Sequence, residues 1–140
     1  MENKFFDIVE FHTSDTKNGV LTMIQESGIV AGFKMPFQIK KTLVINNMKP
    51  SDTRGGHTHH KTNQIVFAVS GSCTVTLDNG FQKEKVKLDK TNRGLMLYPY
   101  VWHTMENFDE NTVLLVLADT EYDEKDYIRK YEDFLGFVKK

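Results

Sequence analysis

The chain has 140 residues, of which 39% are hydrophobic and 26% charged, and its formal net charge is −1. This length and composition are typical of one globular domain with a substantial core, which we place at residues 1–140. The near-neutral charge gives no basis for non-specific attraction to nucleic acid or to an acidic membrane surface.

Three local features predict where the protein works. The longest purely apolar run, Val113 to Ala118, is too short to cross a bilayer. The first ten residues mix acids with bases and lack the apolar segment of a secretion signal. Cys73 is the only cysteine, so no internal disulfide can form. We therefore expect a cytoplasmic protein that contacts neither membrane nor nucleic acid.

The middle of the chain has the patterns of short β-strands. From Ser72 to Leu77 apolar and polar residues alternate, as in a strand with one buried face, and Asp78-Asn79-Gly80 then predicts a hairpin turn. The expected strands are Lys41 to Ile45, Ile65 to Val69, Ser72 to Leu77, Phe81 to Leu88, Gly94 to Tyr98 and Val113 to Ala118. Short strands with frequent turn signals predict an antiparallel sandwich or barrel.

The C-terminal segment changes to a helical period. Asp123 and Glu124 precede it, where acidic residues suit the start of a helix. Its apolar residues at helical spacing are Tyr127, Tyr131, Phe134, Leu135 and Val138. The pattern predicts one amphipathic helix lying on the β-structure.

The segment from Thr53 to Gln64, TRGGHTHHKTNQ, contains three of the five histidines. His57 and His59 are two apart, so in a strand both rings point to one face, whereas His60 points to the other and is expected near the surface. Such a pair either binds a metal, or transfers protons, or consists of two hydrogen-bonded core histidines.

The spacing of these residues resembles the two signature motifs of the cupin superfamily. The matching positions are His57, His59, Gly71, Gly94, Pro99, His103 and Asn107. Gln64 stands where metal-binding cupins carry a glutamate, and an amide in place of a carboxylate weakens a site for a divalent ion. Three histidines alone can still hold zinc. We expect no metal and no other cofactor, with the metal-dependent alternative left open.

Longer stretches are similar to the sugar 3,4-ketoisomerase family, which acts on dTDP-4-keto-6-deoxyglucose. They are RGGHTHH, GSCTVTLDNG, VWHTM, VLLVLAD and EYDEKDYIRKYEDF, and the similarity extends from Asn18-Gly19 to Phe134. The resemblance implies an all-β cupin jelly roll with a C-terminal amphipathic helix. It also implies a homodimer with exchanged N-terminal strands, no metal, and a place in 3-amino-3,6-dideoxysugar biosynthesis.

The same resemblance implies roles for particular residues. His59 is the expected proton-transferring base and His57 orients it or moves protons between the sugar oxygens, which suits the near-neutral pKa of histidine. Gln64 orients a histidine or the sugar. The dTDP diphosphate is expected to bind the cations Arg54, Arg129 and Lys41.

Two positions concern the outcome of the reaction. His103 matches the family branch that gives a galacto-configured product, while the second position that affects the configuration falls near Asn18 and matches neither branch. Asn18 and His103 are therefore included among the expected substrate-binding residues.

One departure from the family keeps other functions open. Family members commonly carry a tyrosine where this chain has Leu43, so a hydroxyl near the substrate is missing. The alternatives are a metal-dependent cupin enzyme, a non-catalytic sugar-binding cupin, and a dTDP-sugar 3,5-epimerase.

Overall fold

The computed structural model describes residues 5–140. Residues 1–4 lie outside the described residues, and they include the start of the N-terminal segment in which we expect no secretion signal. The strands are β1 (Asp7–Glu10), β2 (His12–Thr16), β3 (Gly19–Met23), β4 (Ile29–Val30), β5 (Phe33–Lys34), β6 (Lys41–Ile45), β7 (Arg54–His59), β8 (Gln64–Ser70), β9 (Cys73–Asp78), β10 (Lys83–Leu88), β11 (Arg93–Leu97), β12 (Trp102–Glu106), β13 (Val113–Ala118) and β14 (Tyr127–Ile128). A 3-10 helix, η1 (Glu124–Asp126), and one α-helix, α1 (Tyr131–Val138), complete the described elements.

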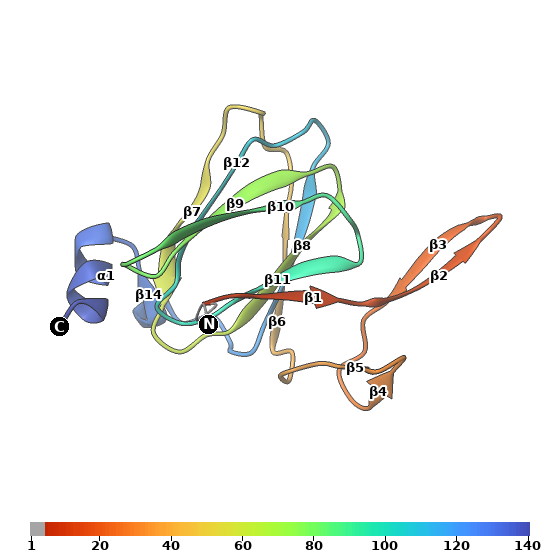
Figure 1. The fold of residues 1–140 in the computed structure, drawn as a ribbon, viewed down its shortest axis with the longest axis horizontal. Coiled ribbons are helices and arrows are strands. Elements are labelled where there is room, and N and C mark those ends of the chain that lie inside the picture. Colours follow the sequence, from red (N-terminus) through yellow and green to blue (C-terminus); the bar gives the residue numbers. More distant parts are fainter. Residues whose placement is uncertain (1–4) are drawn as a thin grey trace.

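Two five-stranded antiparallel sheets form the body of the molecule (Figure 1). One has the order β1-β11-β8-β13-β6 and the other β10-β9-β12-β7-β14. Residues from both sheets form one apolar cluster, with Val66 and Leu114 from the first sheet and Val75 and Leu77 from the second. This arrangement confirms the predicted all-β fold with a C-terminal helix.

The strand predictions hold because the hydrophobic pattern follows burial. Strands β6 and β13 begin and end where the sequence predicts, and the other four predicted strands differ by one or two residues at their ends. In β8, Ile65 to Ala68 are buried on both faces because Val66 and Ala68 pack into the cluster between the sheets while Ile65 and Phe67 pack into a second cluster with Phe11 and Met35, so the pattern is continuous and does not alternate.

The C-terminal prediction is wrong in its boundaries. The helix begins only at Tyr131, and Tyr127 belongs to β14, which pairs antiparallel with the end of β7. Asp123 caps η1 instead, where its side chain accepts a hydrogen bond from the Lys125 N–H. The edge of β7 offers unpaired backbone groups, and pairing with them overrides the helical pattern of this segment.

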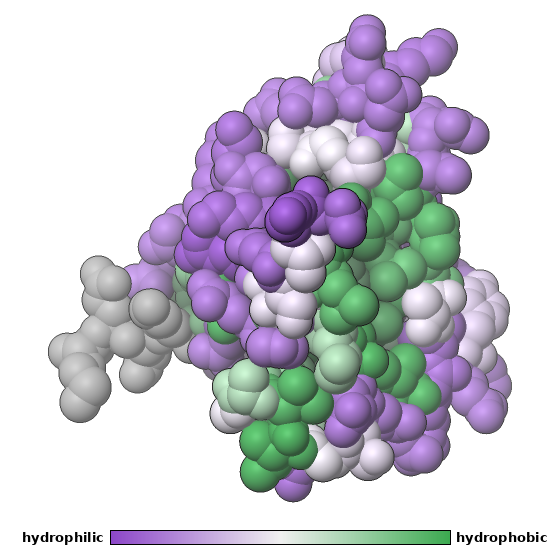
Figure 2. Space-filling model, turned by 90° about the vertical axis from the view of Figure 1, so that its right-hand side faces the viewer, coloured by the Kyte–Doolittle hydropathy of each residue, from purple (hydrophilic) through white to green (hydrophobic). Residues whose placement is uncertain are grey.

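The N-terminal hairpin β2–β3 extends away from the two sheets (Figure 1). Its two strands hydrogen-bond only to each other among the described elements. Val20, Leu21 and Met23 are exposed on it, and Ile29 is exposed in the next hairpin. Figure 2 views the molecule from this side, where hydrophobic side chains cover a broad area of the surface. No helix among residues 5–140 is long and apolar enough to span a membrane.

We expect Gly71→Ala to lower the free energy of unfolding by more than about 2 kcal/mol, as measured by urea denaturation. Gly71 has φ +73°, and a Cβ there would lie 2.7 Å from the Cα of Thr112. Gly32 is the matched control, since its φ is +84° and no atom lies within 4 Å of the added carbon. Gly32→Ala should cost about 1–2 kcal/mol, from the backbone conformation alone. Equal losses in the two variants would contradict the role of the Thr112 contact.

Candidate active site

The pairing of β7 with β12 brings three histidines together. His57 and His59 alternate inward along β7, and His103 on β12 lies directly opposite His57. The ring centroid of His57 is 4.7 Å from that of His103 and 5.2 Å from that of His59. The predicted convergence of these three residues is confirmed.

His57 and His103 line a cavity of about 210 Å³ between the two sheets, and His59 lies beside them without lining it. Apolar side chains form one part of its wall, and two arginines and a tyrosine form another. The lining residues are Leu43, Ile45, Arg54, Gly55, His57, Gln64, His103, Met105, Val116, Tyr127 and Arg129. Tyr127 is the only one of these lining residues that carries a hydroxyl group.

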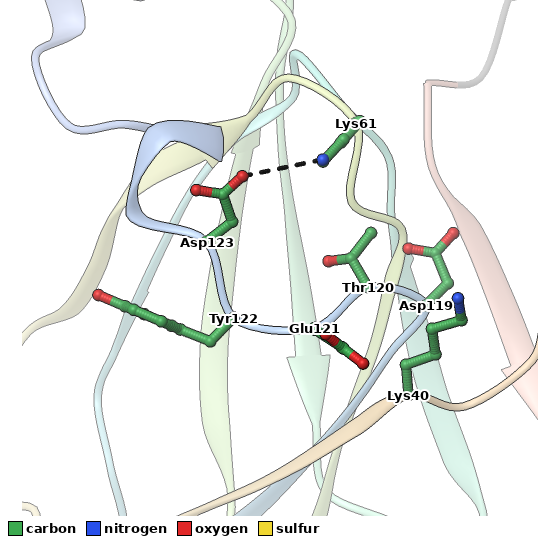
Figure 3. Close-up of a pocket in the computed structure, with 7 residues that line it drawn as sticks. All are labelled: Lys40, Lys61, Asp119, Thr120, Glu121, Tyr122 and Asp123. Carbon is green, nitrogen blue, oxygen red and sulfur yellow. Dashed lines mark ion pairs between the residues drawn. The ribbon is translucent and has the colours of Figure 1, made fainter.

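A larger cavity of about 480 Å³ lies on the outer side of the segment before η1 (Figure 3). Its wall combines two lysines with three acids, and the Lys61 ammonium lies 3.8 Å from the Asp123 carboxylate. No histidine lines this cavity. An exposed ion pair of this kind contributes little energy, so we place the chemistry in the smaller cavity.

Burial keeps two of the histidines neutral. Burial, together with the nearby His59, Arg129 and Arg54, lowers the pKa of His57 to about 4. His103 is fully buried, and burial together with His57 lowers its pKa to about 3. Both rings therefore carry free electron pairs at neutral pH, as proton acceptors need.

His59 differs from the other two because it has an acidic neighbour. Its Nδ1 lies 3.2 Å from Oδ2 of Asp126, close enough for an ion pair although the two groups lack the alignment of a full hydrogen bond. Burial lowers the pKa of His59, and Asp126 partly restores it. Asp126 was not predicted from the sequence, because the segment around it has the pattern of the start of a helix.

Positive charge stands at the mouth of the cavity. The Arg129 guanidinium lies 4.2 Å from the centroid of the Tyr127 ring and donates two hydrogen bonds to the Glu124 carboxylate. These donors, with Tyr122, hold the pKa of Glu124 at about 2. Arg54 also lines the cavity and is exposed. Both predicted phosphate-binding arginines therefore lie where a ligand would enter.

The remaining predicted residues have different positions. Gln64 is buried in the cavity wall, and Leu43 lies there too, so the apolar side chain does take the place predicted for it. Lys41 does not line the cavity, although its charge lowers the pKa of His59. Asn18 is not part of the cavity in this chain, because it lies in the exposed turn of the projecting hairpin.

His60 points away from the other histidines, as the alternation predicts, but it is half-buried and not on the surface. Its Nδ1 lies 2.9 Å from the Tyr100 hydroxyl, and its ring packs against Phe137 of α1. Within residues 5–140, no three His, Cys, Asp or Glu side chains are arranged as a metal site.

Comparison with known proteins gives a consistent set of relatives. A family model described as FdtA, WxcM-like, C-terminal, matches residues 1–139. The chain is 37% identical to the TDP-4-oxo-6-deoxy-alpha-D-glucose-3,4-oxoisomerase of Aneurinibacillus thermoaerophilus, over 100% of this chain and 95% of that protein.

Solved structures are similar over nearly the whole chain. A histidine-to-asparagine mutant of the 3,4-ketoisomerase QdtA from Thermoanaerobacterium thermosaccharolyticum, in complex with TDP-4-keto-6-deoxyglucose, matches with a TM-score of 0.89. Its identity is 33%, covering 96% of this chain and 94% of that one. WlaRA, a TDP-fucose-3,4-ketoisomerase, and WlaRB, a TDP-quinovose 3,4-ketoisomerase, both from Campylobacter jejuni, each match with TM-score 0.85 and 32% identity. Each alignment covers 96% of this chain; it covers 96% of the WlaRA chain and 99% of the WlaRB chain.

The buried neutral histidines predict how stability depends on pH. His57 and His103 have lower pKa values in the folded chain than the ordinary 6.5, so the unfolded chain takes up protons first as the pH falls. Their contribution is complete above about pH 6.5 and declines below it, by about 1.4 kcal/mol per pH unit for each ring.

Urea denaturation between pH 7.5 and pH 4.5 measures this slope. His103→Gln removes one of the two rings, so its free energy of unfolding should fall less steeply with decreasing pH. His12→Gln is the control, since His12 lies in β2 and is not part of the cluster. An unchanged slope in His103→Gln would show that His103 takes up its proton without unfolding.

Proposed function

This chain belongs to the family described as FdtA, WxcM-like, C-terminal, and we propose that it is a sugar-nucleotide 3,4-ketoisomerase. The proposed substrate is dTDP-4-keto-6-deoxyglucose. The relative from Aneurinibacillus is named for this substrate, and the relative from Thermoanaerobacterium was solved in complex with it. The observation that carries the proposal is the cluster of neutral histidines, two of which line a cavity that Arg54 and Arg129 also line.

The reaction moves a ketone by two proton transfers. The ketone at C4 makes the hydrogen on C3 acidic, and His59 takes this proton to leave an enediolate. The proton returns to C4, while the hydroxyl proton of O3 passes to O4 with the help of His57. Atoms and charge balance without an added reactant, so the residues need only accept, hold and return protons.

The size of the cavity divides the substrate into two parts. A volume of about 210 Å³ is below the roughly 300–1,000 Å³ of pockets that enclose a whole drug-sized ligand. We therefore place the keto-sugar inside, with Gln64 beside it, and the nucleotide outside. The diphosphate then meets Arg54 and Arg129, with Lys41 as a more distant cation.

The configuration of the product at C4 is proposed to be galacto. This choice rests on His103, which forms part of the cavity wall opposite His57. The two Campylobacter relatives, named for fucose and quinovose, are equally similar to this chain and do not separate the two outcomes. A galacto product would enter the route to dTDP-3-amino-3,6-dideoxygalactose.

We also propose that the protein is a cytoplasmic homodimer in which N-terminal strands are exchanged. The exposed apolar side chains of the β2–β3 hairpin support an interface there, because such residues rarely gather on the surface of a monomer. In such a dimer Asn18 of one chain would reach the other chain, which is the one way it can take part in binding.

Incubation with dTDP-4-keto-6-deoxyglucose in deuterated water tests the reaction. We expect the native protein to give a 3-keto product and to exchange hydrogen at C3 and C4, as followed by NMR. His59→Ala should lose turnover by about 10²-fold or more, with dTDP affinity by calorimetry nearly unchanged.

His60→Ala is the matched control, since His60 is the neighbouring histidine whose ring lies outside the cavity, and its turnover should stay close to the native value. Retained turnover in His59→Ala would remove His59 from the base role. Deuterium at C5 with the ketone still at C4 would indicate a 3,5-epimerase, and no exchange in the native protein would indicate a binding protein. The same spectrum gives the configuration at C4.

If the β2–β3 hairpin forms the dimer interface, a charged side chain introduced on it should weaken the dimer. Leu21 is 56% exposed in the single chain, so Leu21→Lys should leave the fold intact but shift the protein toward monomer in sedimentation velocity. Val44 on β6 is similarly exposed, at 61%, and Val44→Lys should leave the dimer unchanged. A native monomer, or equal behaviour of the two variants, would contradict this interface.

A further inference from the structure

His57, His59 and His103 form one cluster, of which His57 and His103 line the cavity, yet only one histidine can be the first to take the proton. Position alone does not select it, since the centroids of His57 and His59 are 5.2 Å apart. What distinguishes them is the charge that surrounds each ring.

Asp126 is a buried carboxylate held in place by several donors. It is 5% exposed, and it accepts hydrogen bonds from the Thr62 hydroxyl and the Lys61 N–H, the second at 2.8 Å. These donors outweigh the effect of burial and lower its pKa, so it is ionised. Thr62 is in turn within 2.7 Å of the Thr120 hydroxyl. A buried charge without partners would cost several kcal/mol, and this network reduces that cost.

The backbone brings this carboxylate to His59. The carbonyl of Asp126 accepts a hydrogen bond of 2.9 Å from the His60 N–H, and Tyr127 pairs directly with His59. Both contacts fix the end of η1 against the last residues of β7. Asp126 Oδ2 therefore faces His59 Nδ1 because of strand pairing, and not because two long side chains happen to meet.

The groups around the two histidines differ in sign. His57 is near the cations Arg54 and Arg129, which oppose its protonation, and the acid that interacts with it, Glu124, is exposed and paired with Arg129. His59 is opposed by the more distant charges of Lys41 and Arg129 but favoured by Asp126. The groups that face His59 are Asp126, Lys41, Arg129, His57, His103 and Tyr127.

We propose that Asp126 is a positioning residue that selects His59, rather than His57, as the histidine that accepts the proton from C3. This proposal rests on the proposed ketoisomerase function. The Asp126 carboxylate, 3.2 Å from Nδ1 of His59, favours the proton of the neutral ring on Nδ1, so that the free electron pair which accepts the proton from C3 is on the buried Nε2.

The step is balanced without a further reactant. The C3–H bond breaks, its electron pair forms the C3–C4 double bond of the enediolate, and the proton forms a bond to Nε2. The imidazolium that results lies against an ionised carboxylate, whose charge compensates the new positive charge. The proton then leaves Nε2 for C4, and Asp126 remains ionised throughout.

Asp126→Asn in the full-length protein tests this role. The amide keeps the size and most of the hydrogen bonds but removes the charge. We expect kcat to fall on the order of 10²-fold while the dTDP dissociation constant stays nearly unchanged. The acidic limb of the kcat/KM profile should move to lower pH, because His59 loses the neighbour that favours its protonated form.

Asp119→Asn is the matched control for a purely structural effect. Asp119 also fixes the loop that precedes η1, by accepting hydrogen bonds from the backbone and side chain of Asn63, both at 2.9 Å. It contacts no histidine of the cluster. Its variant should keep the native pH profile and kcat even where its melting temperature falls.

A second measurement does not depend on activity or on the folding of a variant. In the native protein labelled with ¹⁵N on histidine, the ring of His59 should titrate at higher pH than that of His57. The proposal is overturned if His57 titrates first as the pH falls, or if Asp126→Asn keeps the native kcat and pH profile. It is also overturned if Asp119→Asn shifts the profile equally. Absence of turnover in the native protein would instead refute the proposed function, since the order of titration is measured without substrate.

Discussion

The pairing of β7 on both of its edges is the constraint on which the site depends. On one edge β12 sets His103 opposite His57, and on the other β14 sets Tyr127 opposite His59. A shift of one residue in either pairing would turn the affected side chains to the other face of the sheet. The positions of the histidines, the tyrosine and the acid before it thus follow from one strand and its two neighbours.

This arrangement also explains how a histidine cluster remains stable without charge. Removing a charged imidazole from water is costly, so the buried rings favour the neutral form. The same neutrality is what proton abstraction requires. Stability and the proposed chemistry therefore demand the same protonation state, whereas Asp126 is the buried acid that favours the protonated state of His59.

The sequence could predict the parts of this site that lie within one strand. The spacing of His57 and His59 determines their common face, and the apolar patterns of β6, β8 and β13 follow directly from burial. Asp126 was missed because its contact with His59 joins segments that are far apart in the chain. Its local pattern is that of a helix, and only competition from the open edge of β7 makes the segment a 3-10 turn followed by a strand.

Because the cations are exposed and the histidines are buried, ionic strength should affect nucleotide binding and proton transfer to different extents. Arg54 and Arg129 are exposed at the mouth, where dissolved ions reach them and the screening distance is about 8 Å at physiological ionic strength. His59 and Asp126 are shielded from those ions by the two sheets. In the proposed enzyme, added salt would therefore weaken capture of the nucleotide while leaving the proton transfer nearly untouched, so that recognition responds to the ionic surroundings and chemistry does not.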